Sequence, residues 1–407
     1  MSRTIIYKED VFMRKKFGKR LVTLSLALVL GLSFTGCGKS DDSEETTTAT
    51  EAATTEASKD ETVAAEGTDS DDASDSSYAE LDAISDKSLK VKILSNKESL
   101  CLAPVHIAQI NGYFDEEFAK AGVEYEMVVS NFDTITEQIS SKDINAGYGL
   151  TGSLMLPISN GLDIVFVTGL HTGCTKYYVK PDSDIKTLED LKGKTIGVPS
   201  LSDSSVIQLK RKLADLGFVV TGDKADINLV AYAMTDLPVA LDNGAVDAVG
   251  LHDPVATTAE ESYGFTKILD TGTDEKFVNE YCCQAYVSGE LAEKNPAGAA
   301  AYARAIQRAC AYIEAEPIEA ARLQVENGYM PGDYEHNGQI LESFDFNPSV
   351  AKGRATFENT FDELQKTGDL DESLDKDEFV SKIYPTLPGI PETTTYDKDT
   401  GEFTEVY

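Results

Sequence analysis

Basic side chains are scarce in this sequence. Lysine and arginine total 36, whereas aspartate and glutamate total 70, so the formal net charge is -34. Nucleic-acid binding needs a basic face, and adsorption to an anionic membrane needs positive surface charge. The composition therefore counts against nucleic acid as a partner and against membrane binding through charge. It is typical of a secreted, soluble protein.

Motifs for metal binding and catalysis are also absent. The six cysteines and four histidines include no CxxC pair and no Cys/His spacing of a zinc site. Cys101, Cys174, His171 and His252 would have to converge on a metal, and nothing in their spacing indicates that they do. No G-x-S-x-G turn and no acid/base pair stands at an informative spacing. We therefore expect no metal, no cofactor and no catalytic residue.

The N-terminus has the pattern of a bacterial export signal. Basic residues between Arg14 and Arg20 precede an apolar run over 21–34, which is short for a bilayer span. The run ends in FTGC, which resembles a lipobox, although Phe34 stands where leucine is usual. We expect residues 1–36 to be a signal peptide and Cys37 to carry a lipid. The alternative is an ordinary signal peptide, and Met13 is an alternative start.

Residues 37–87 form a low-complexity segment of Thr, Ser, Ala, Asp and Glu. Such a composition buries too little apolar surface to offset the loss of chain entropy on folding. We expect a disordered acidic linker that holds a folded body away from a lipid anchor.

From Leu89 onward, strand and helix patterns alternate. Strands are expected in the runs VKILS, VEYEMVV, INAGYGL, DIVFVTG, KTIGVP, DINLVAYA, DAVGL and FTKILD, and one helix is expected over 104–122. Alternation with short connections predicts an α/β fold with a parallel sheet. Residues 285–385 are mostly helical in pattern. Residues 386–407 are expected to be a tail with a hairpin that turns at Asp399.

Four stretches of this region carry a family resemblance. They are VKILSNKESLCLAPVHIAQINGYFDEE, INAGYGLTGSLMLPISNGLDIVFV, LEDLKGKTIGVPSLSDSS and LPVALDNGAVDAVGLHDP. In this order they resemble extracytoplasmic solute-binding proteins of ABC importers. The most similar group binds nitrate, sulfonate or taurine and includes binders of thiamine-pyrimidine precursors. His252 departs from the family's usual tryptophan, and HTGC at 171–174 departs from an ordinary strand.

The resemblance implies an α/β, two-lobe periplasmic-binding-protein fold of type II with a helical C-terminal part. Lobe 1 would comprise 88–172 and 285–385, and lobe 2 would comprise 173–284. Two hinge strands, 171–180 and 281–287, would join the lobes, which close over a ligand. The resemblance further implies a lipid-anchored, extracytoplasmic monomer whose partners are a small-molecule solute and an ABC permease with its ATPase.

Two helix starts are the expected centre of the ligand site. One is SLSDSS, which contains Ser200, Ser202, Asp203 and Ser204, and the other is GYGLTG, which contains Gly149, Thr151 and Gly152. Free backbone N–H groups and the helix dipole make such starts suitable for an anion. The alternative roles are helix capping for the first start and close strand–helix packing for the second. A lone G-x-G-x-x-G match is weak, because no acidic residue follows at the distance a dinucleotide site requires.

Further candidates come from the loop after the first strand and from the hinge. Asn96, Ser99 and Leu100 follow the first strand, His252 and Asp253 end another, and His171 lies at the hinge. Each of these also has a possible structural role. The resemblance places the two hinge strands side by side, so a disulfide between Cys174 and either Cys282 or Cys283 is expected to be possible.

We therefore expect a receptor that delivers a small oxyanion, of the aliphatic sulfonate, taurine or nitrate type, to a permease. The alternative within the receptor class is a pyrimidine, thiamine precursor or other aromatic nutrient. Outside that class the rivals are an enzyme on the same fold and a surface sensor that signals through a partner.

Overall fold

The computed structural model describes residues 78–97, 99–130 and 134–407. The predicted signal peptide, the lipidation of Cys37 and nearly all of the predicted linker lie outside these residues. Within them, no helix combines the length and the apolar character that crossing a membrane requires.

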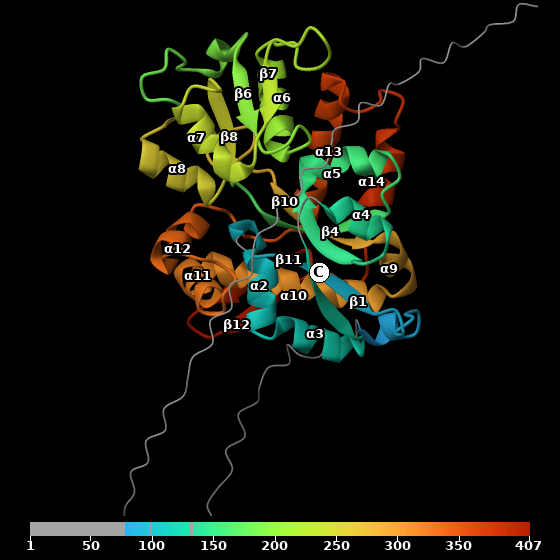
Figure 1. The fold of residues 1–407 in the computed structure, drawn as a ribbon. Coiled ribbons are helices and arrows are strands. Elements are labelled where there is room, and N and C mark those ends of the chain that lie inside the picture. Colours follow the sequence, from blue (N-terminus) through green and yellow to red (C-terminus); the bar gives the residue numbers. More distant parts are fainter. Residues whose placement is uncertain (1–77, 98, 131–133) are drawn as a thin grey trace, which may run out of the picture. The chain divides into compact units, whose positions relative to one another are not determined.

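Two five-stranded mixed sheets organise the described chain (Figure 1). The first has the order β2-β1-β3-β10-β4 and the second has the order β7-β6-β8-β5-β9. The strands of the first sheet are β1 (Val91–Ser95), β2 (Tyr125–Val129), β3 (Ala146–Leu150), β4 (Ile164–His171) and β10 (Cys283–Ser288). Those of the second are β5 (Thr175–Val179), β6 (Thr195–Val198), β7 (Asn228–Ala231), β8 (Ala248–His252) and β9 (Thr266–Asp270).

The chain passes twice between the two sheets. The first crossing, residues 172–174, joins β4 to β5, and the second crossing, residues 271–282, joins β9 to β10. The strand that arrives from the other sheet is antiparallel in both cases: β5 against β8 and β9, and β10 against β3 and β4. The predicted α/β fold is confirmed, and the two sheets are mixed for this reason, because the remaining pairings are parallel.

Helices cover both faces of each sheet, which explains the almost continuous apolar runs of the inner strands. The first half contributes η1 (Leu100–Leu102), α2 (Ala103–Ile110), α3 (Tyr113–Ala121), α4 (Ile135–Ser140) and α5 (Thr151–Ser159). Around the second sheet are η3 (Leu188–Leu191), α6 (Ser204–Asp215), η4 (Met234–Asp236), α7 (Leu237–Asp242) and α8 (Val255–Tyr263). The single helix expected over 104–122 is two helices, because Gly112 adopts a left-handed φ of 75° between α2 and α3.

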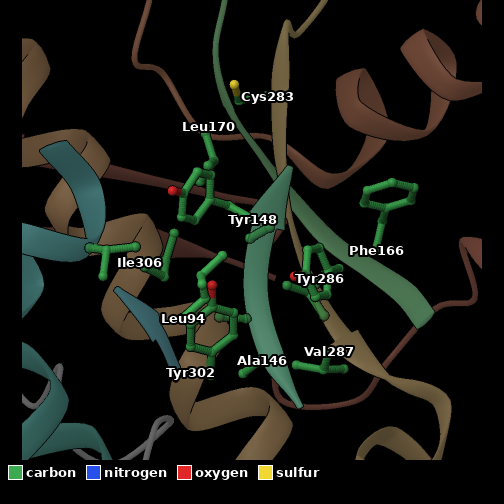
Figure 2. Packing of buried hydrophobic residues seen from close by; sticks show 14 of the residues in the cluster. Leu94, Ala146, Tyr148, Phe166, Leu170, Cys283, Tyr286, Val287, Tyr302 and Ile306 are labelled. Atoms are coloured by element: carbon green, nitrogen blue, oxygen red, sulfur yellow. The ribbon is translucent and has the colours of Figure 1, made fainter. Parts of the chain in front are cut away.

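The C-terminal helices return to the first sheet. They are α9 (Gly289–Lys294), α10 (Pro296–Ala315), α11 (Pro317–Glu326), α12 (Tyr334–Glu342), α13 (Val350–Thr367) and α14 (Lys376–Ile383). The alanine-rich α10 is buried, and Tyr302 donates a hydrogen bond to the carbonyl of Gly147 in β3 at 2.6 Å. On the other face, Phe166 of β4 stacks on Tyr384. Figure 2 shows Tyr302 and Ile306 beside Leu94, with Phe166 on the far side of the strands.

A buried ionic cluster joins the first described residues to the C-terminal hairpin. Glu117 of α3 and Arg304 of α10 are both 0% exposed, with Nε and Oε2 2.9 Å apart. Tyr78 donates to Glu117 at 2.9 Å, and Arg304 also reaches Glu405 at 3.0 Å. Glu405 belongs to the hairpin of β11 (Thr393–Asp397) and β12 (Glu402–Val406), which turns at 398–401.

The same cluster includes residues that the composition predicted to be part of a disordered linker. Residues 78–82 are helical, and Tyr78 is only 3% exposed. The guanidinium of Arg304 lies 4.9 Å from the centre of the Tyr78 ring, which favours a cation–π contact. Disorder was predicted up to residue 87, but Tyr78 and Leu81 are among the few large apolar residues of that segment, and both are buried.

Replacing Glu117 with Gln is expected to lower the free energy of unfolding by about 3–5 kcal/mol, because it leaves the buried Arg304 without its main charge partner. Glu116→Gln is the matched control, because this neighbouring carboxylate is 49% exposed and pairs with Lys120 and Arg308. Its loss is expected to cost about 0–1 kcal/mol. Urea denaturation measures both changes. Equal effects of the two variants would contradict the role assigned to Glu117.

Candidate functional site

The start of α6 is organised by Asp203. This residue is the N-cap, and its carboxylate accepts hydrogen bonds from the backbone N–H of Ser205 at 2.8 Å and from the Ser205 hydroxyl at 2.6 Å. The same oxygen lies 2.8 Å from Nε2 of His252, at the end of β8. One carboxylate oxygen of Asp203, Oδ1, thus takes part in three contacts with protein groups.

Burial and charge have opposite effects on the pKa values of Asp203 and His252. Burial alone would lower the pKa of His252, but the adjacent Asp203 carboxylate outweighs burial and raises that pKa well above its usual value. Burial likewise would raise the pKa of Asp203, whereas the charge and hydrogen bond of His252 lower it. The two groups therefore form an ion pair, which ties the N-terminus of α6 to β8.

A small cavity lies between the starts of α5 and α6. We call it the α5–α6 cavity, and its volume of about 20 Å³ is room for little more than one water molecule. Gly152 and Ile207 meet at this place so closely that a Cβ on Gly152 would lie 2.9 Å from Ile207. The cavity is lined by Thr151, Gly152, Ser204, Ile207, Gln208, Arg211, Glu280, Tyr281, Cys282, Thr356 and Thr360.

Two buried polar atoms at the cavity lack a protein partner. Ser204 is 2% exposed, and its hydroxyl makes no hydrogen bond; the same is true of Oε1 of Gln208. Buried polar atoms in proteins are nearly always paired, so an unpaired one indicates a water, ion or ligand. The hydroxyl of Thr151, at the start of α5, donates to the carbonyl of Tyr281 at 3.0 Å.

Arg211 gives the cavity a charged wall. Its guanidinium contacts Glu280 at 2.8 Å and Glu363, and Nη1 lies 3.4 Å from Oγ1 of Thr360. Burial raises the pKa of Glu280, and the positive charge of Arg211 opposes that shift. The wall therefore offers both a fixed cation and carboxylate acceptors.

A larger groove lies on the outer side of the same contact. It measures about 680 Å³ and is mostly apolar, with Ser153, Leu156, Ser202, Lys210 and Asp369 among its lining residues. Gly152 and Ile207 line both the groove and the α5–α6 cavity. A separation of these two residues would join the two spaces.

The predicted residues divide into three groups in the structure. Thr151, Gly152 and Ser204 line the α5–α6 cavity, and Ser202 lines the outer groove. Ser200 is exposed nearby, with its hydroxyl 3.4 Å from that of Ser202. The others line neither space: Asn96, Ser99, Leu100, Gly149, His171, Asp203, His252 and Asp253.

Several of these other residues have structural roles. The carbonyl of Asn96 lies 2.6 Å from Nε2 of His106, and Leu100 is in the core. Asp253 pairs with Lys176 at 2.7 Å and accepts from the N–H of Thr257 at 2.9 Å. These residues therefore form contacts within the protein itself rather than lining a ligand space.

Sequence reasoning missed Gln208, Arg211 and Glu280. A signal for the first two exists, because Ser204, Gln208 and Arg211 follow each other at spacings of four and three and so share one face of α6. Glu280 carries no such signal. It reaches the cavity only through the path of the second crossing.

The cysteines gather at the two crossings. Cys101, Cys174, Cys282 and Cys283 are buried and free, and the Sγ atoms of Cys174 and Cys282 lie 3.0 Å apart. The possible disulfide at these positions is not formed, since a bond requires about 2.05 Å. The two thiols of that pair nevertheless come from the two crossings, one from each.

Two α/β sheets joined by a double crossing define a periplasmic-binding-protein fold, and solved structures share it. The sulfonate-binding protein SsuA of Escherichia coli superposes with a TM-score of 0.60 at 19% identity, over 73% of this chain and 98% of that one. The nitrate-binding protein NrtA of Synechocystis gives 0.59 at 12%, over 72% and 85%. The CA3427 gene product of Candida albicans, described as having this fold, gives 0.57 at 15%, over 76% and 99%.

The sequence itself assigns the family. Residues 101–320 match the family described as NMT1/THI5 like, and the chain belongs to that family. No curated protein sequence matches the chain.

The Asp203–His252 pair predicts a pH-dependent stability. The folded-state pKa of His252 is raised, so its contribution is complete below the unfolded-state pKa of about 6.5 and is lost as the pH rises through the folded-state value. The difference in unfolding free energy between wild type and His252→Gln should therefore shrink as the pH increases.

Chemical denaturation at a series of pH values measures this difference. His336→Gln is the control, because His336 is a third exposed and lies 3.7 Å from Glu261. A wild-type advantage that stays constant, or grows, with rising pH would show that His252 is not held protonated by Asp203.

Proposed function

We propose that the protein is the solute-binding component of an ABC importer. It would capture a small solute with an oxyanion group, of the aliphatic sulfonate, taurine or nitrate type, and deliver it to a permease. The observation that carries this proposal is the α5–α6 cavity, in which two helix starts face buried polar atoms without protein partners.

The oxyanion class follows from the donors at the cavity. The helix dipoles favour negative charge at the first turns of α5 and α6. Of the backbone N–H groups there, that of Thr151 donates to the carbonyl of Cys282 and that of Ser205 to Asp203, so the dipoles and the side chains carry the argument. The hydroxyl of Ser204 and the guanidinium of Arg211 add donors on the same side of α6. A sulfonate has three oxygens and so can accept from several of these donors at once.

The hydrogen-bond acceptors on the cavity wall indicate which kind of oxyanion-bearing solute fits best. Oε1 of Gln208 has no partner, and Glu280 lies beside Arg211 on the cavity wall. The amide oxygen of Gln208 and the carboxylate of Glu280 both accept hydrogen bonds. A nitrate ion has no hydrogen to donate to them. We therefore favour a solute in which an ammonium group accompanies the oxyanion, as in taurine.

Capture requires movement. The cavity is too small for such a solute while Gly152 contacts Ile207, so the two lobes, 88–172 with 285–385 and 173–284, must separate to admit it. The crossings at 172–174 and 271–282 are short and are the natural pivots. Opening would join the cavity to the outer groove, and closure would bring both helix starts onto the solute.

We propose that the protein acts without catalysis. Cys282 is the nucleophilic side chain on the cavity wall, and its interaction with Cys174, together with burial, raises the pKa of Cys282 to about 12. A thiol that stays protonated at neutral pH is a poor nucleophile. The rival receptor for a pyrimidine or thiamine precursor lacks a matching observation, because His171 and His252 do not line the cavity.

Ligand class is tested by thermal unfolding of the full chain with taurine, ethanesulfonate, nitrate and a hydroxymethylpyrimidine. Taurine is expected to raise the melting temperature most, since a ligand at a hundredfold excess over its Kd adds about 2.7 kcal/mol of stability. Ser204→Ala should weaken taurine binding about two- to tenfold through the loss of one hydrogen bond.

Ser200→Ala is the matched control, because this exposed hydroxyl precedes the same helix but does not line the cavity. Its affinity for taurine should equal that of the wild type. A shift with the pyrimidine alone would refute the oxyanion proposal, and an equal loss of affinity in both serine variants would remove the α5–α6 cavity as its site.

We further propose that the protein is anchored outside the cytoplasmic membrane as a monomer through a lipid on Cys37, after removal of residues 1–36. In a bacterial host, Cys37→Ser is expected to move the protein from the membrane fraction to the soluble or secreted fraction. Cell fractionation with metabolic labelling by a fatty acid measures this change. Ser33→Ala, inside the apolar run, is the control, and unlabelled wild-type protein would refute the anchor.

A further inference from the structure

Three segments that are remote in the sequence bring sulfur and nitrogen atoms together at the crossings. Cys101 lies in η1, His171 ends β4 and Cys283 begins β10. Their two Sγ atoms and a ring nitrogen of His171 all lie within 4.8 Å of one another, and the three residues are buried. Figure 2 shows Cys283 at the end of β10, beside Leu170.

His171 supplies an independent indication of a ligand. The residue is 0% exposed, and its Nδ1 lies 3.1 Å from the carbonyl of Thr172. Its Nε2 is buried without a partner. A metal-binding histidine commonly donates its other ring N–H to a backbone carbonyl, as Nδ1 is placed to do here.

The ring of His171 is also held in place. It stacks on Phe344 at a centroid distance of 5.2 Å and packs at the same distance against Phe346. These contacts fix the direction of Nε2 without using it. An unpaired nitrogen with a fixed orientation beside two thiols is the geometry expected of a preorganised ligand.

Cys174, in the first crossing, is the candidate for a fourth ligand, and its Sγ lies outside the set of atoms that are within 4.8 Å of one another. Its own outer contacts are Sγ of Cys282 at 3.0 Å and Nδ1 of His252 at 3.8 Å. To reach an ion held by Cys101, His171 and Cys283, the Cys174 side chain would turn away from these two contacts.

We propose that Cys101, His171, Cys174 and Cys283 form a site for a soft, tetrahedrally coordinated metal ion of the zinc type. Three thiolates and one imidazole are a common structural zinc set, and soft sulfur ligands select such ions. The prediction of no metal rested on sequence spacing, and spacing could not indicate such a site, because the four proposed ligands are separated by 70, 3 and 109 residues.

Binding is a ligand exchange with a defined proton balance. One Zn²⁺ ion replaces three thiol protons, which pass to solvent, and the neutral imidazole adds its Nε2 lone pair. No oxidant or reductant takes part. Because the ligands come from η1, the end of β4, the first crossing and the start of β10, a bound ion would tie the first crossing, on which the sheets pivot, to the first sheet.

The test uses the full chain, reduced with a phosphine and kept anaerobic. Zinc content after passage over a desalting column is expected to be one equivalent, and a chromophoric chelator measures the affinity. Substitution by Co²⁺ should produce the absorption of thiolate-to-cobalt charge transfer together with tetrahedral d–d bands. Cys283→Ser and His171→Gln should each weaken zinc binding more than about tenfold.

Cys310→Ala is the matched control, because this cysteine is buried and free in α10 but lies outside the group. It should bind zinc like the wild type. Failure of the reduced wild type to retain zinc, or cobalt spectra without thiolate charge transfer, would overturn the proposal, even if the variants failed to fold. A Cys174–Cys282 disulfide in the anaerobically purified protein would overturn it as well. Taurine binding in the same preparations reports separately on the proposed function.

Discussion

The double crossing of the chain is the constraint on which the rest of the structure depends. Each sheet contains one strand that arrives from the other sheet, and that strand is antiparallel to its neighbours. A backbone hydrogen bond joins the second crossing to the strand before the first one: the N–H of Cys282 donates to the carbonyl of His171 at 3.0 Å. This bond holds the end of β4 beside the start of β10. The α5–α6 cavity and the thiol group both border this place, because Cys282 lines the first and contacts the second.

The candidate residues of this protein differ in whether their buried polar atoms have hydrogen-bond partners within the protein. Those with partners have structural roles, and those without are candidates for binding. Asp203, His252 and Asp253 have suitable chemistry for a ligand, but capping bonds and ion pairs already occupy them. Ser204 and His171 are buried and Gln208 is half-buried, and each has one buried polar atom without a partner. A buried polar atom left without a partner is costly, so such atoms are kept where something else binds. The proposals for a solute and for a metal rest on this same physical argument, at two neighbouring places.

Much of the fold was predictable because its signals are local. Apolar runs bounded by glycine, proline and polar residues marked the eight predicted strands, and six of them form the parallel pairings. Errors arose where local pattern was incomplete. Gly112 divides a continuous helical pattern, and Tyr78 is drawn into the body by Glu117 and Arg304, far away in the sequence. At the site, the two helix starts were predicted, whereas Glu280, Arg211 and the convergence of the thiols were not.

The sequence by itself determined the α/β class, the positions of the two helix starts and the residue types available at them, since these depend on neighbours within a few positions. Only the tertiary structure decided which of those residues face a cavity. Asp203 and Ser204 are adjacent in the sequence, yet one is bonded to His252 and the other is turned to the space beside Arg211. This difference arises because β8, which is remote in the sequence, ends beside Asp203 in the folded chain. Neither composition nor spacing contains that information, because it arises when the chain crosses twice between its sheets.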